Sequence, residues 1–277
     1  METLAGKVAL ITGAGRRQGL GYAIARRLAA DGAAVALTDL ADPRELMEAD
    51  RIGTRAELEE LAAELRAAGG RAIALALDVT DEASVDAAFA RCVRELGRLD
   101  VLVNNAGIGY LIDPLTEASK AAWDAVLGVN LTGAFLCSRA AARIMIGQGE
   151  GGRIVNVASQ AAKSGFPHMS AYVASKHGLV GLTRTHAIEL GPHGITVNAV
   201  CPNHVTTGLG AVQNEYFAKL RGFPSVDAYL ADMKNRIPMR RVGLAGDTAA
   251  ACAWLCSDDA AYVTGEAMNV SGGVEMH

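Results

Sequence analysis

The sequence predicts an α/β fold in which a parallel sheet of about seven strands has helices on both faces. Short runs of β-branched and aliphatic residues alternate with longer segments of helical period along most of the chain. The short runs are apolar at consecutive positions, which is typical of strands that are buried on both faces. Together these observations predict parallel strands joined by right-handed helical crossovers, which make a doubly wound sheet.

The individual strands and helices follow from the same alternation. Six strands are visible, and each ends at polar or glycine residues: KVALIT, AVALTD, AIALALD, DVLVNNAG, RIVNVAS and ITVNAV. Helices are expected over Tyr22–Ala30, Ala56–Ala68, Ala83–Leu96, Ala121–Ile146 and Ala171–Leu190. A helix over Asp247–Cys256 and a last strand near Ala267–Val270 complete the chain, and Asp42–Thr54 is interpreted as a surface excursion.

The chain is expected to form one domain over residues 1–277, because it shows neither an internal repeat nor a linker. Only the segment Asn203–Arg241 lacks a clean period. It holds several helix-breaking residues among polar and aromatic ones, namely Gly208, Gly210, Gly222, Pro224 and Pro238. We predict that this segment forms a mobile lid over a site.

Composition excludes several classes of protein. A hydrophobic share of 51% against 20% charged residues argues against disorder. The net charge of −4, with signs interspersed, offers no basic tract for nucleic acid. Five cysteines without a CxxC pair indicate reduced core thiols and neither a disulfide framework nor a metal site. No apolar run approaches the roughly 18–20 residues that cross a bilayer, and no signal peptide is visible, so a cytoplasmic protein without membrane partners is expected.

A glycine-rich turn follows the first strand and leads directly into a helix, which is the context of a Rossmann-type dinucleotide site. Glycines let the backbone bend and approach a pyrophosphate, while the helix presents unpaired N–H groups and a partial positive charge. A purely structural turn is the alternative interpretation. The candidate residues of this turn are Gly13, Gly15, Arg16, Gln18, Gly19 and Leu20.

Asp39 ends the second strand, where a carboxylate can accept hydrogen bonds from both hydroxyls of the adenosine ribose. This favours NAD over NADP, because a 2′-phosphate would be repelled there. NADP stays open as an alternative, since Arg16 or Arg17 could bind such a phosphate from another side. A strand-terminal turn former is the purely structural interpretation of Asp39.

Polar residues and glycine also end the third and fourth strands, at the sheet edge where ligands bind in open α/β folds. We expect Asp78, Val79, Asn105, Ala106 and Gly107 to surround the adenine and the nicotinamide ribose.

Tyr172 and Lys176 place a phenol and an ammonium four residues apart on one face of a predicted helix. A free phenol has a pKa of about 10, and a nearby positive charge favours the phenolate that a general base needs. Ser159 ends the fifth strand and is expected to hydrogen-bond the reacting oxygen while Tyr172 transfers its proton.

These motifs, in this order, resemble the short-chain dehydrogenase/reductase family: a TGxxxGxG-like turn, Asn104-Asn105-Ala106-Gly107, Ser159 and Tyr172-xxx-Lys176. The resemblance covers nearly the whole chain. It implies Tyr172 as acid/base, Ser159 orienting the carbonyl, Lys176 tuning the phenol and holding the nicotinamide ribose, and Asn130 supporting a water-linked proton path. It also implies a homotetramer built through two long helices, and a cofactor site that includes Tyr172, Lys176, Pro202 and Val205.

Three departures from the family pattern are visible. The spacing from Gly13 to Gly19 is two residues longer than usual, so the phosphate cradle is expected to be reshaped. Asn203 replaces a glycine, and the turn there depends on the tolerance of Asn for left-handed conformations. Ser271 replaces an aspartate, and the sequence alone suggests no role for it.

We therefore expect hydride transfer between NAD and a secondary alcohol or its ketone, with a polyol or sugar-like substrate as one class. The candidate substrate-binding residues are Ser159, Gln160, His168, Tyr172, Asn203 and His204. One alternative is an NADP-dependent ketone or 3-oxoacyl reductase, although no basic entrance for such thioesters is evident. A second is a catalytically silent dinucleotide-sensing scaffold, which would need none of the Ser, Tyr and Lys set.

Overall fold

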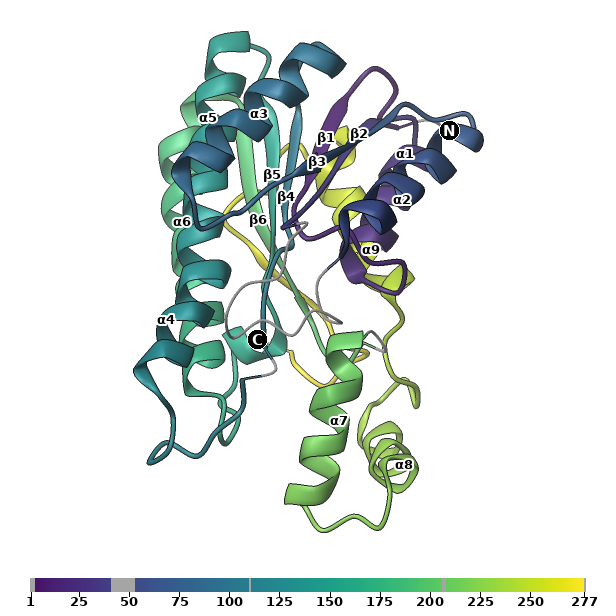
Figure 1. The fold of residues 1–277 in the computed structure, drawn as a ribbon, viewed down its shortest axis with the longest axis vertical. Helices are drawn as coiled ribbons and strands as arrows, with labels where there is room; N and C mark the ends of the chain where they lie inside the picture. The colour runs from purple at the N-terminus through teal and green to yellow at the C-terminus, as the bar shows by residue number, and fades with distance from the viewer. Residues whose placement is uncertain (1–2, 41–52, 110, 206–207, 277) are drawn as a thin grey trace.

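Seven parallel strands form one sheet in the computed structural model, which describes residues 3–40, 53–109, 111–205 and 208–276 (Figure 1). Their order is β3-β2-β1-β4-β5-β6-β7, so the chain reverses its direction of travel across the sheet between β1 and β4. The expected fold class is confirmed. The strands are β1 Val8–Ile11, β2 Ala34–Asp39, β3 Ala72–Ala76, β4 Val101–Asn104, β5 Gly152–Val157, β6 Ile195–Pro202 and β7 Ala267–Val270.

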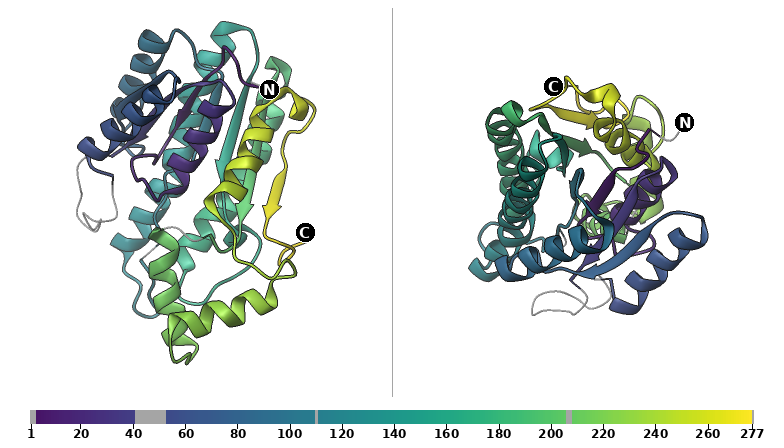
Figure 2. Two further views of the ribbon diagram at one scale, coloured as in Figure 1. Left: turned by 90° about the vertical axis from the view of Figure 1, so that its right-hand side faces the viewer. Right: turned by 90° about the horizontal axis from the view of Figure 1, so that it is seen from above.

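Helices cover both faces of this sheet, with α1, α2 and α9 on one side and α3, α5 and α6 on the other (Figures 1 and 2). The helices are α1 Leu20–Ala30, α2 Arg55–Ala67, α3 Glu82–Leu96, α4 Lys120–Leu127, α5 Ala134–Gln148, α6 Ser170–Leu190, α7 Gly208–Leu220, α8 Val226–Arg236 and α9 Ala245–Cys256. Several begin where a short polar side chain accepts a hydrogen bond from the first turn, as Asp81 does for α3.

The two faces explain the continuous apolar runs in the sequence. Along β1, Ala9 and Ile11 pack against the α1 side, while Val8 and Leu10 pack against the α3 side. Every position of the strand is therefore buried, so the sequence shows no alternation between inside and outside residues. The five cysteines are buried thiols in this core.

The predicted helix Ala121–Ile146 is interrupted. α4 passes through one π-helical turn, Gly128–Gly133, before α5 continues it. Gly133 allows this turn to lie close to the loop that follows β3, since a Cβ on Gly133 would lie 2.6 Å from Val79 Cγ2. The combined helix Lys120–Gln148 is long and apolar enough to cross a membrane, but 56% of its most apolar window is buried inside the protein, as in a core helix.

The segment Asn203–Arg241, called the lid below after its predicted role, contains two helices, α7 and α8, which extend below the sheet in Figure 1. That this segment moves over the site stays a prediction. Phe217, Tyr229 and Met233 of these helices lie in a small apolar cluster, which also includes Ile112 and Met169 from outside the segment. The helical period of apolar residues was not evident in the sequence because each of these helices buries only a few aromatic and methionine side chains. Gly222 and Pro224 also interrupt the segment between the two helices. Most of the predicted excursion Asp42–Thr54 lies outside the described residues.

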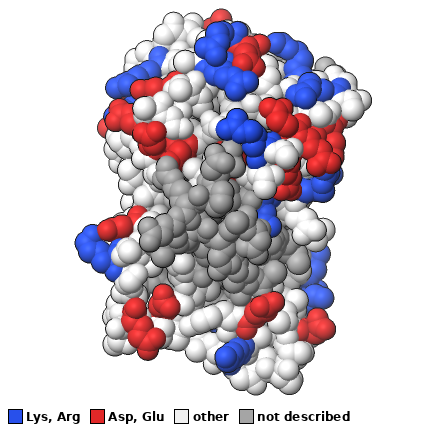
Figure 3. Space-filling view, in the orientation of Figure 1, with Lys and Arg blue, Asp and Glu red and all other residues white. Residues whose placement is uncertain are grey.

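Charged side chains are dispersed over the surface. On the face shown in Figure 3, Lys and Arg lie among Asp and Glu, without a large basic region on the part that is coloured. Among the described residues, no group of three His, Cys, Asp or Glu is placed to hold a metal ion.

Candidate active site

A cavity of about 500 Å³ lies at the carboxyl ends of the strands, where the strand order reverses between β1 and β4. Its walls come from the glycine turn, from the ends of β2 to β6, from α6 and from the lid helices. Most of the residues predicted for the cofactor and substrate sites line it: Gly13, Arg16, Gln18, Gly19, Leu20, Asp39, Asp78, Val79, Asn105, Ala106, Gly107, Ser159, Gln160, Tyr172, Lys176, Pro202, Asn203, His204 and Val205.

The glycine turn is held against the end of β4. Asn105 Nδ2 donates to the carbonyl oxygens of Thr12 and Gly13, at 2.9 Å each. Gly13 has φ +65°, and a Cβ there would lie 2.7 Å from the Cα of Ala106, so no other residue fits. α1 then begins at Leu20, and its N-cap residue Gly19 makes no side-chain cap hydrogen bond; both residues border the cavity, so the start of the helix with its unpaired N–H groups lies beside it. This cradle fits a pyrophosphate.

Asp39 lies beside the same turn. Its Oδ2 accepts a hydrogen bond from Gly15 N at 2.8 Å, and a Cβ on Gly15 would lie 2.7 Å from Asp39 Cβ. Burial raises the pKa of Asp39, while the N–H groups of Gly15 and Leu40 and the charge of Arg16 act in the opposite direction. The carboxylate borders the cavity, and each of its oxygens keeps a lone pair for a ribose hydroxyl.

Arg17, in the lengthened glycine turn, reaches α2. Arg17 N donates to Glu57 Oε1 at 2.9 Å, and Arg17 Nη1 donates to Glu64 Oε2 at 2.7 Å. Arg16 borders the cavity, whereas Arg17 is occupied by these acidic side chains. Of the two arginines considered for a 2′-phosphate, only Arg16 is therefore placed to meet it.

The adjacent asparagines of the fourth strand have different roles. Asn104 points away from the cavity and donates to Asn156 Oδ1 at 2.8 Å and to Ser138 Oγ at 2.9 Å, in a buried polar network. Asn105 instead ties the glycine turn to β4, as described above. The turn after β3 is shaped by Asp78, whose Oδ1 accepts hydrogen bonds from the backbone and hydroxyl of Thr80.

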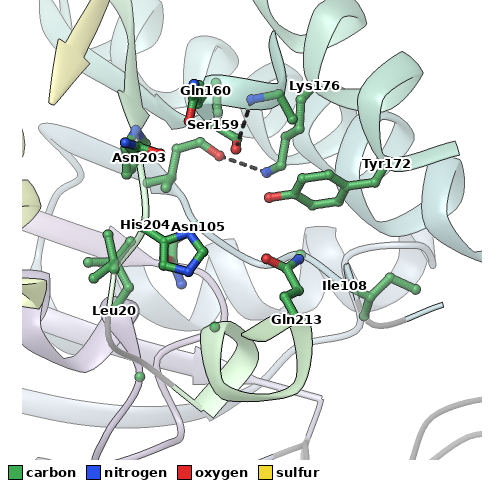
Figure 4. Close-up of a pocket in the computed structure, with 18 of the residues that line it drawn as sticks. Leu20, Asn105, Ile108, Ser159, Gln160, Tyr172, Lys176, Asn203, His204 and Gln213 are labelled. Atoms are coloured by element: carbon green, nitrogen blue, oxygen red, sulfur yellow. Dashed lines mark hydrogen bonds between the residues drawn. The ribbon is translucent and has the colours of Figure 1, made fainter. Parts of the chain in front are cut away.

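Ser159, Tyr172 and Lys176 gather at the centre of the cavity (Figure 4). Ser159 follows the end of β5, while Tyr172 and Lys176 lie on the first turns of α6. Lys176 is buried, its Nζ donates to Val157 O at 2.8 Å, and it lies 5.6 Å from the centroid of the Tyr172 ring. The structure thus brings Ser159, from the end of a strand, to the two groups on α6, as the sequence predicted.

The protonation of these groups is dominated by burial. Burial raises the pKa of Tyr172, and the hydrogen bond with the Ser159 hydroxyl opposes this shift. Burial also lowers the pKa of Lys176 to about 8. We expected Lys176 together with the charge of the oxidised nicotinamide to lower the pKa of the phenol. In the protein alone, burial outweighs the neighbouring groups and raises the pKa of Tyr172, and the effect of the nicotinamide stays a prediction.

Asn130 lies in the π-helical turn and does not border the cavity. It is buried, its Oδ1 accepts from Ile108 N at 2.8 Å, and its Nδ2 donates to Ile108 O at 3.0 Å and to Ser175 Oγ at 3.1 Å. Ser175 in turn donates to Tyr172 O at 2.7 Å. Asn130 therefore joins the segment after β4 to the helix that carries Tyr172, and its place in a water-linked proton path stays a prediction.

Asn130→Ala is expected to lower the free energy of unfolding by about 2–4 kcal/mol, because it leaves buried backbone groups of Ile108 unpaired. Urea unfolding of the cofactor-free protein measures this. Asn235→Ala, at an exposed position of α8, serves as the control and should change stability by less than about 0.5 kcal/mol. An equal, small effect of both substitutions would contradict the structural role of Asn130.

The structure places the predicted substrate residues unevenly. Gln160, Asn203 and His204 border the cavity, whereas His168 is not among the lining residues. Its Nδ1 is paired with the hydroxyl of Tyr216 in α7 at 2.7 Å, and its backbone has φ +65°. Burial lowers the pKa of His204, which also pairs with Asn214.

Two of the family departures now have a physical explanation. Among the described residues, the non-glycine positions with positive φ are His168 and Arg240, so Asn203 does not need the conformational freedom of a glycine. Ser271 Oγ donates to Glu275 O and accepts from Glu275 N, so it closes a turn in the C-terminal tail.

Several lining residues were not predicted. Gln213 borders the cavity, and its Nε2 donates at 2.8 Å to the carbonyl oxygen of Gly109. Gly109 itself is just outside the lining and lies against the Tyr172 ring, since a Cβ on Gly109 would be 2.7 Å from Tyr172 Cε2. The lid supplies an apolar wall and two cationic groups: Phe217, Tyr229, Met233, Ile237, Arg221 and Arg236. Gly109, close after Asn105-Ala106-Gly107, was a visible signal, but the lid residues had none while the helical period of the lid was hidden.

Known proteins are similar to this chain in both sequence and fold. The family model described as enoyl-(acyl carrier protein) reductase matches residues 13–275. A short-chain dehydrogenase/reductase of Armillaria gallica is 39% identical over 97% of this chain and 96% of its own length. The L-2,3-butanediol dehydrogenase of Corynebacterium glutamicum is 38% identical over 97% and 98%. The crystal structure of NAD⁺-bound xylitol dehydrogenase is 36% identical, with a TM-score of 0.88 over 98% of this chain and 99% of that one.

Proposed function

Because the chain belongs to the short-chain dehydrogenase/reductase family, we propose that it transfers hydride between NAD and a small secondary alcohol or the corresponding ketone. Membership makes it an NAD(P)-dependent enzyme that acts on CH–OH groups, as the sequence predicted. The observation that carries the proposal is the convergence of Ser159, Tyr172 and Lys176 beside a glycine cradle in one cavity.

The residues of the chain divide the chemical work. The nicotinamide ring, when bound, accepts or supplies the hydride. The Ser159 hydroxyl orients the reacting oxygen and stabilises its developing charge, and Tyr172 takes or gives the proton of that oxygen. Lys176, fixed by Val157 O, presents a buried cation beside the phenol and near Gly107, where the nicotinamide ribose is expected.

NAD is the proposed cofactor on the strength of Asp39. Its partly buried carboxylate borders the cavity at the end of β2, where it suits ribose hydroxyls and repels a phosphate. Two relatives support a nicotinamide dinucleotide, since the xylitol dehydrogenase structure contains NAD⁺ and the carveol dehydrogenase structure of Mycobacterium avium contains NAD.

Asp39→Asn should raise the NADP to NAD ratio of kcat/KM by roughly tenfold or more, because it removes the repelling charge and keeps the shape. Nicotinamide absorbance with each cofactor measures the ratio. Arg17→Ala is the matched control and should leave the ratio unchanged, since Arg17 is held by Glu64. A strong NADP preference of the wild-type enzyme would overturn the assignment of NAD.

The substrate proposal rests on the mixed walls of the cavity. Gln160, Asn203 and His204 offer hydrogen bonds, while the lid offers an apolar surface, which together suit a small hydroxylated carbon skeleton. Arg221 and Arg236 correct the expectation that no basic group lies near the entrance. They keep a 3-oxoacyl thioester, with its phosphate groups, as a second candidate substrate.

Turnover of a panel of substrates, followed by nicotinamide absorbance, tests the proposal. The panel contains secondary alcohols, vicinal diols, sugars, sugar alcohols and acetoacetyl-coenzyme A, each with NAD(H) and NADP(H). Turnover of a secondary alcohol or ketone supports the proposal. Tight cofactor binding without any turnover would defeat it in favour of the dinucleotide-sensing scaffold.

We further propose that the enzyme acts in the cytoplasm as a homotetramer, without membrane or nucleic-acid partners. Exposed apolar side chains on the helical face of α4 to α6 support the assembly, among them Trp123, Phe135 and Ile188. The interspersed surface charge supports the absence of a nucleic-acid partner.

A further inference from the structure

The C-terminal tail lies against the loop that follows Ser159. Glu275 Oε1 accepts a hydrogen bond from Gln160 Nε2 at 2.7 Å and another from Ser164 Oγ at 2.5 Å. The tail is itself held by the turn that Ser271 closes, and Val274 borders the cavity. A segment that is more than 100 residues away along the chain is thus in direct contact with a lining residue next to Ser159.

The chemistry of this contact fixes the orientation of the Gln160 amide. A carboxylate only accepts hydrogen bonds, so the NH₂ group of Gln160 must face Glu275, and the carbonyl oxygen Oε1 is on the other side. The backbone of Gln160 is also fixed, because its carbonyl accepts from Lys163 N at 2.9 Å and from Ser164 N at 3.1 Å. Within the part of the chain that the structure describes, no hydrogen bond reaches Gln160 Oε1.

We infer that Glu275 is a positioning residue that makes Gln160 an acceptor toward the cavity, and that the substrate therefore carries a second hydroxyl group beside the reacting one. Ser159 meets the reacting oxygen, and the next residue in the chain accepts a hydrogen bond from the neighbouring hydroxyl. The favoured substrates are vicinal diols, or α-hydroxyketones in the reverse direction. This inference rests on the proposed function and names the substrate class of the same site.

The test compares trans-1,2-cyclohexanediol with cyclohexanol, which lacks only the second hydroxyl. Wild-type kcat/KM should favour the diol by roughly tenfold, the value of one good hydrogen bond. Gln160→Leu should bring the ratio close to one. Glu275→Gln should lower the ratio several-fold, because an amide at position 275 lets Gln160 turn its NH₂ group toward the cavity.

A double variant and a control separate positioning from general damage. Gln160→Leu combined with Glu275→Gln should show the ratio of Gln160→Leu alone, since Glu275 acts through Gln160. Glu266→Gln, at an exposed glutamate near the same end of the chain, should leave the ratio at the wild-type value. If Glu275→Gln lowers turnover of both alcohols equally, Glu275 is only structural and the inference is overturned.

The outcome also distinguishes this inference from the proposed function. The inference fails and the proposed function stands if the wild-type enzyme has the same kcat/KM for cyclohexanol and for the diol. The same conclusion follows if neither of these alcohols reacts while another secondary alcohol of the panel does. If no secondary alcohol or ketone of the panel reacts, the proposed function itself fails.

Discussion

Tyr172→Phe should lower kcat by about 10³-fold or more while the affinity for the nicotinamide cofactor stays within a few-fold of wild type. The substitution removes only the hydroxyl that exchanges a proton with the reacting oxygen. The ring keeps its contacts with Gly109 and the neighbouring apolar clusters, so the cavity keeps its shape. Turnover is followed by nicotinamide absorbance, and cofactor affinity by titration of the protein with NADH.

Tyr216→Phe is the matched control for this experiment. Tyr216 lies in α7, and its hydroxyl pairs with His168 Nδ1 outside the cavity lining. It should retain turnover within a few-fold of wild type. Undiminished turnover of Tyr172→Phe would remove the assignment of Tyr172 as the acid/base and, with it, the central part of the proposed mechanism.

Lys176→Met should lower kcat/KM by roughly 100-fold and at the same time stabilise the cofactor-free protein. The buried ammonium has a pKa of about 8 in the folded chain, against 10.5 for an ordinary lysine. Below pH 8, keeping this group charged destabilises the folded wild-type protein by about 3 kcal/mol. Lys176→Met removes this cost but also loses the hydrogen bond to Val157 O, which contributes about 1 kcal/mol. The net gain at pH 7 is about 2 kcal/mol.

The pH dependence gives this prediction its sign. Between pH 8 and 10.5 the unfolded chain binds more protons at position 176 than the folded chain, so wild-type stability rises with pH in this window. The advantage of Lys176→Met should therefore shrink as the pH rises from 8 toward 10.5. Urea unfolding at pH 7, 8.5 and 10 measures it, with Lys120→Met at an exposed position as the control. A stability difference that is independent of pH would contradict the buried charge.

The sequence carried enough information to predict the sheet and the catalytic set, because both depend on short-range patterns. The apolar runs of β1 and β5 mark strands wherever they lie, and Tyr172 and Lys176 are neighbours on one helix turn. Ser159 joins them because the ends of neighbouring parallel strands and the following helix meet at one edge of the sheet.

What the sequence did not predict depends on contacts between distant segments. The contact of Glu275 with Gln160 and of Gln213 with Gly109 follows from how the tail and α7 fold back, and neither segment has a pattern that shows its partner. The burial that raises the pKa of Tyr172 in the protein alone was also not predicted, because it depends on the amount of water excluded around the phenol, which residue spacing does not reveal. His168 was predicted to bind substrate because it is near Tyr172 in the sequence, but its side chain pairs with Tyr216 and does not line the cavity.

The separate apolar cluster of the lid has a consequence for how this enzyme can change over evolutionary time. Phe217, Tyr229 and Met233 belong to a cluster of buried residues that is distinct from the two large clusters that flank the sheet, although the Tyr172 ring packs against both it and one of them. Mutations among them alter the shape offered to incoming molecules and do not change the side chains of the two large clusters or of the glycine turn. New substrate preferences can therefore be sampled by descendants of this chain at little risk to the scaffold that makes the chemistry possible.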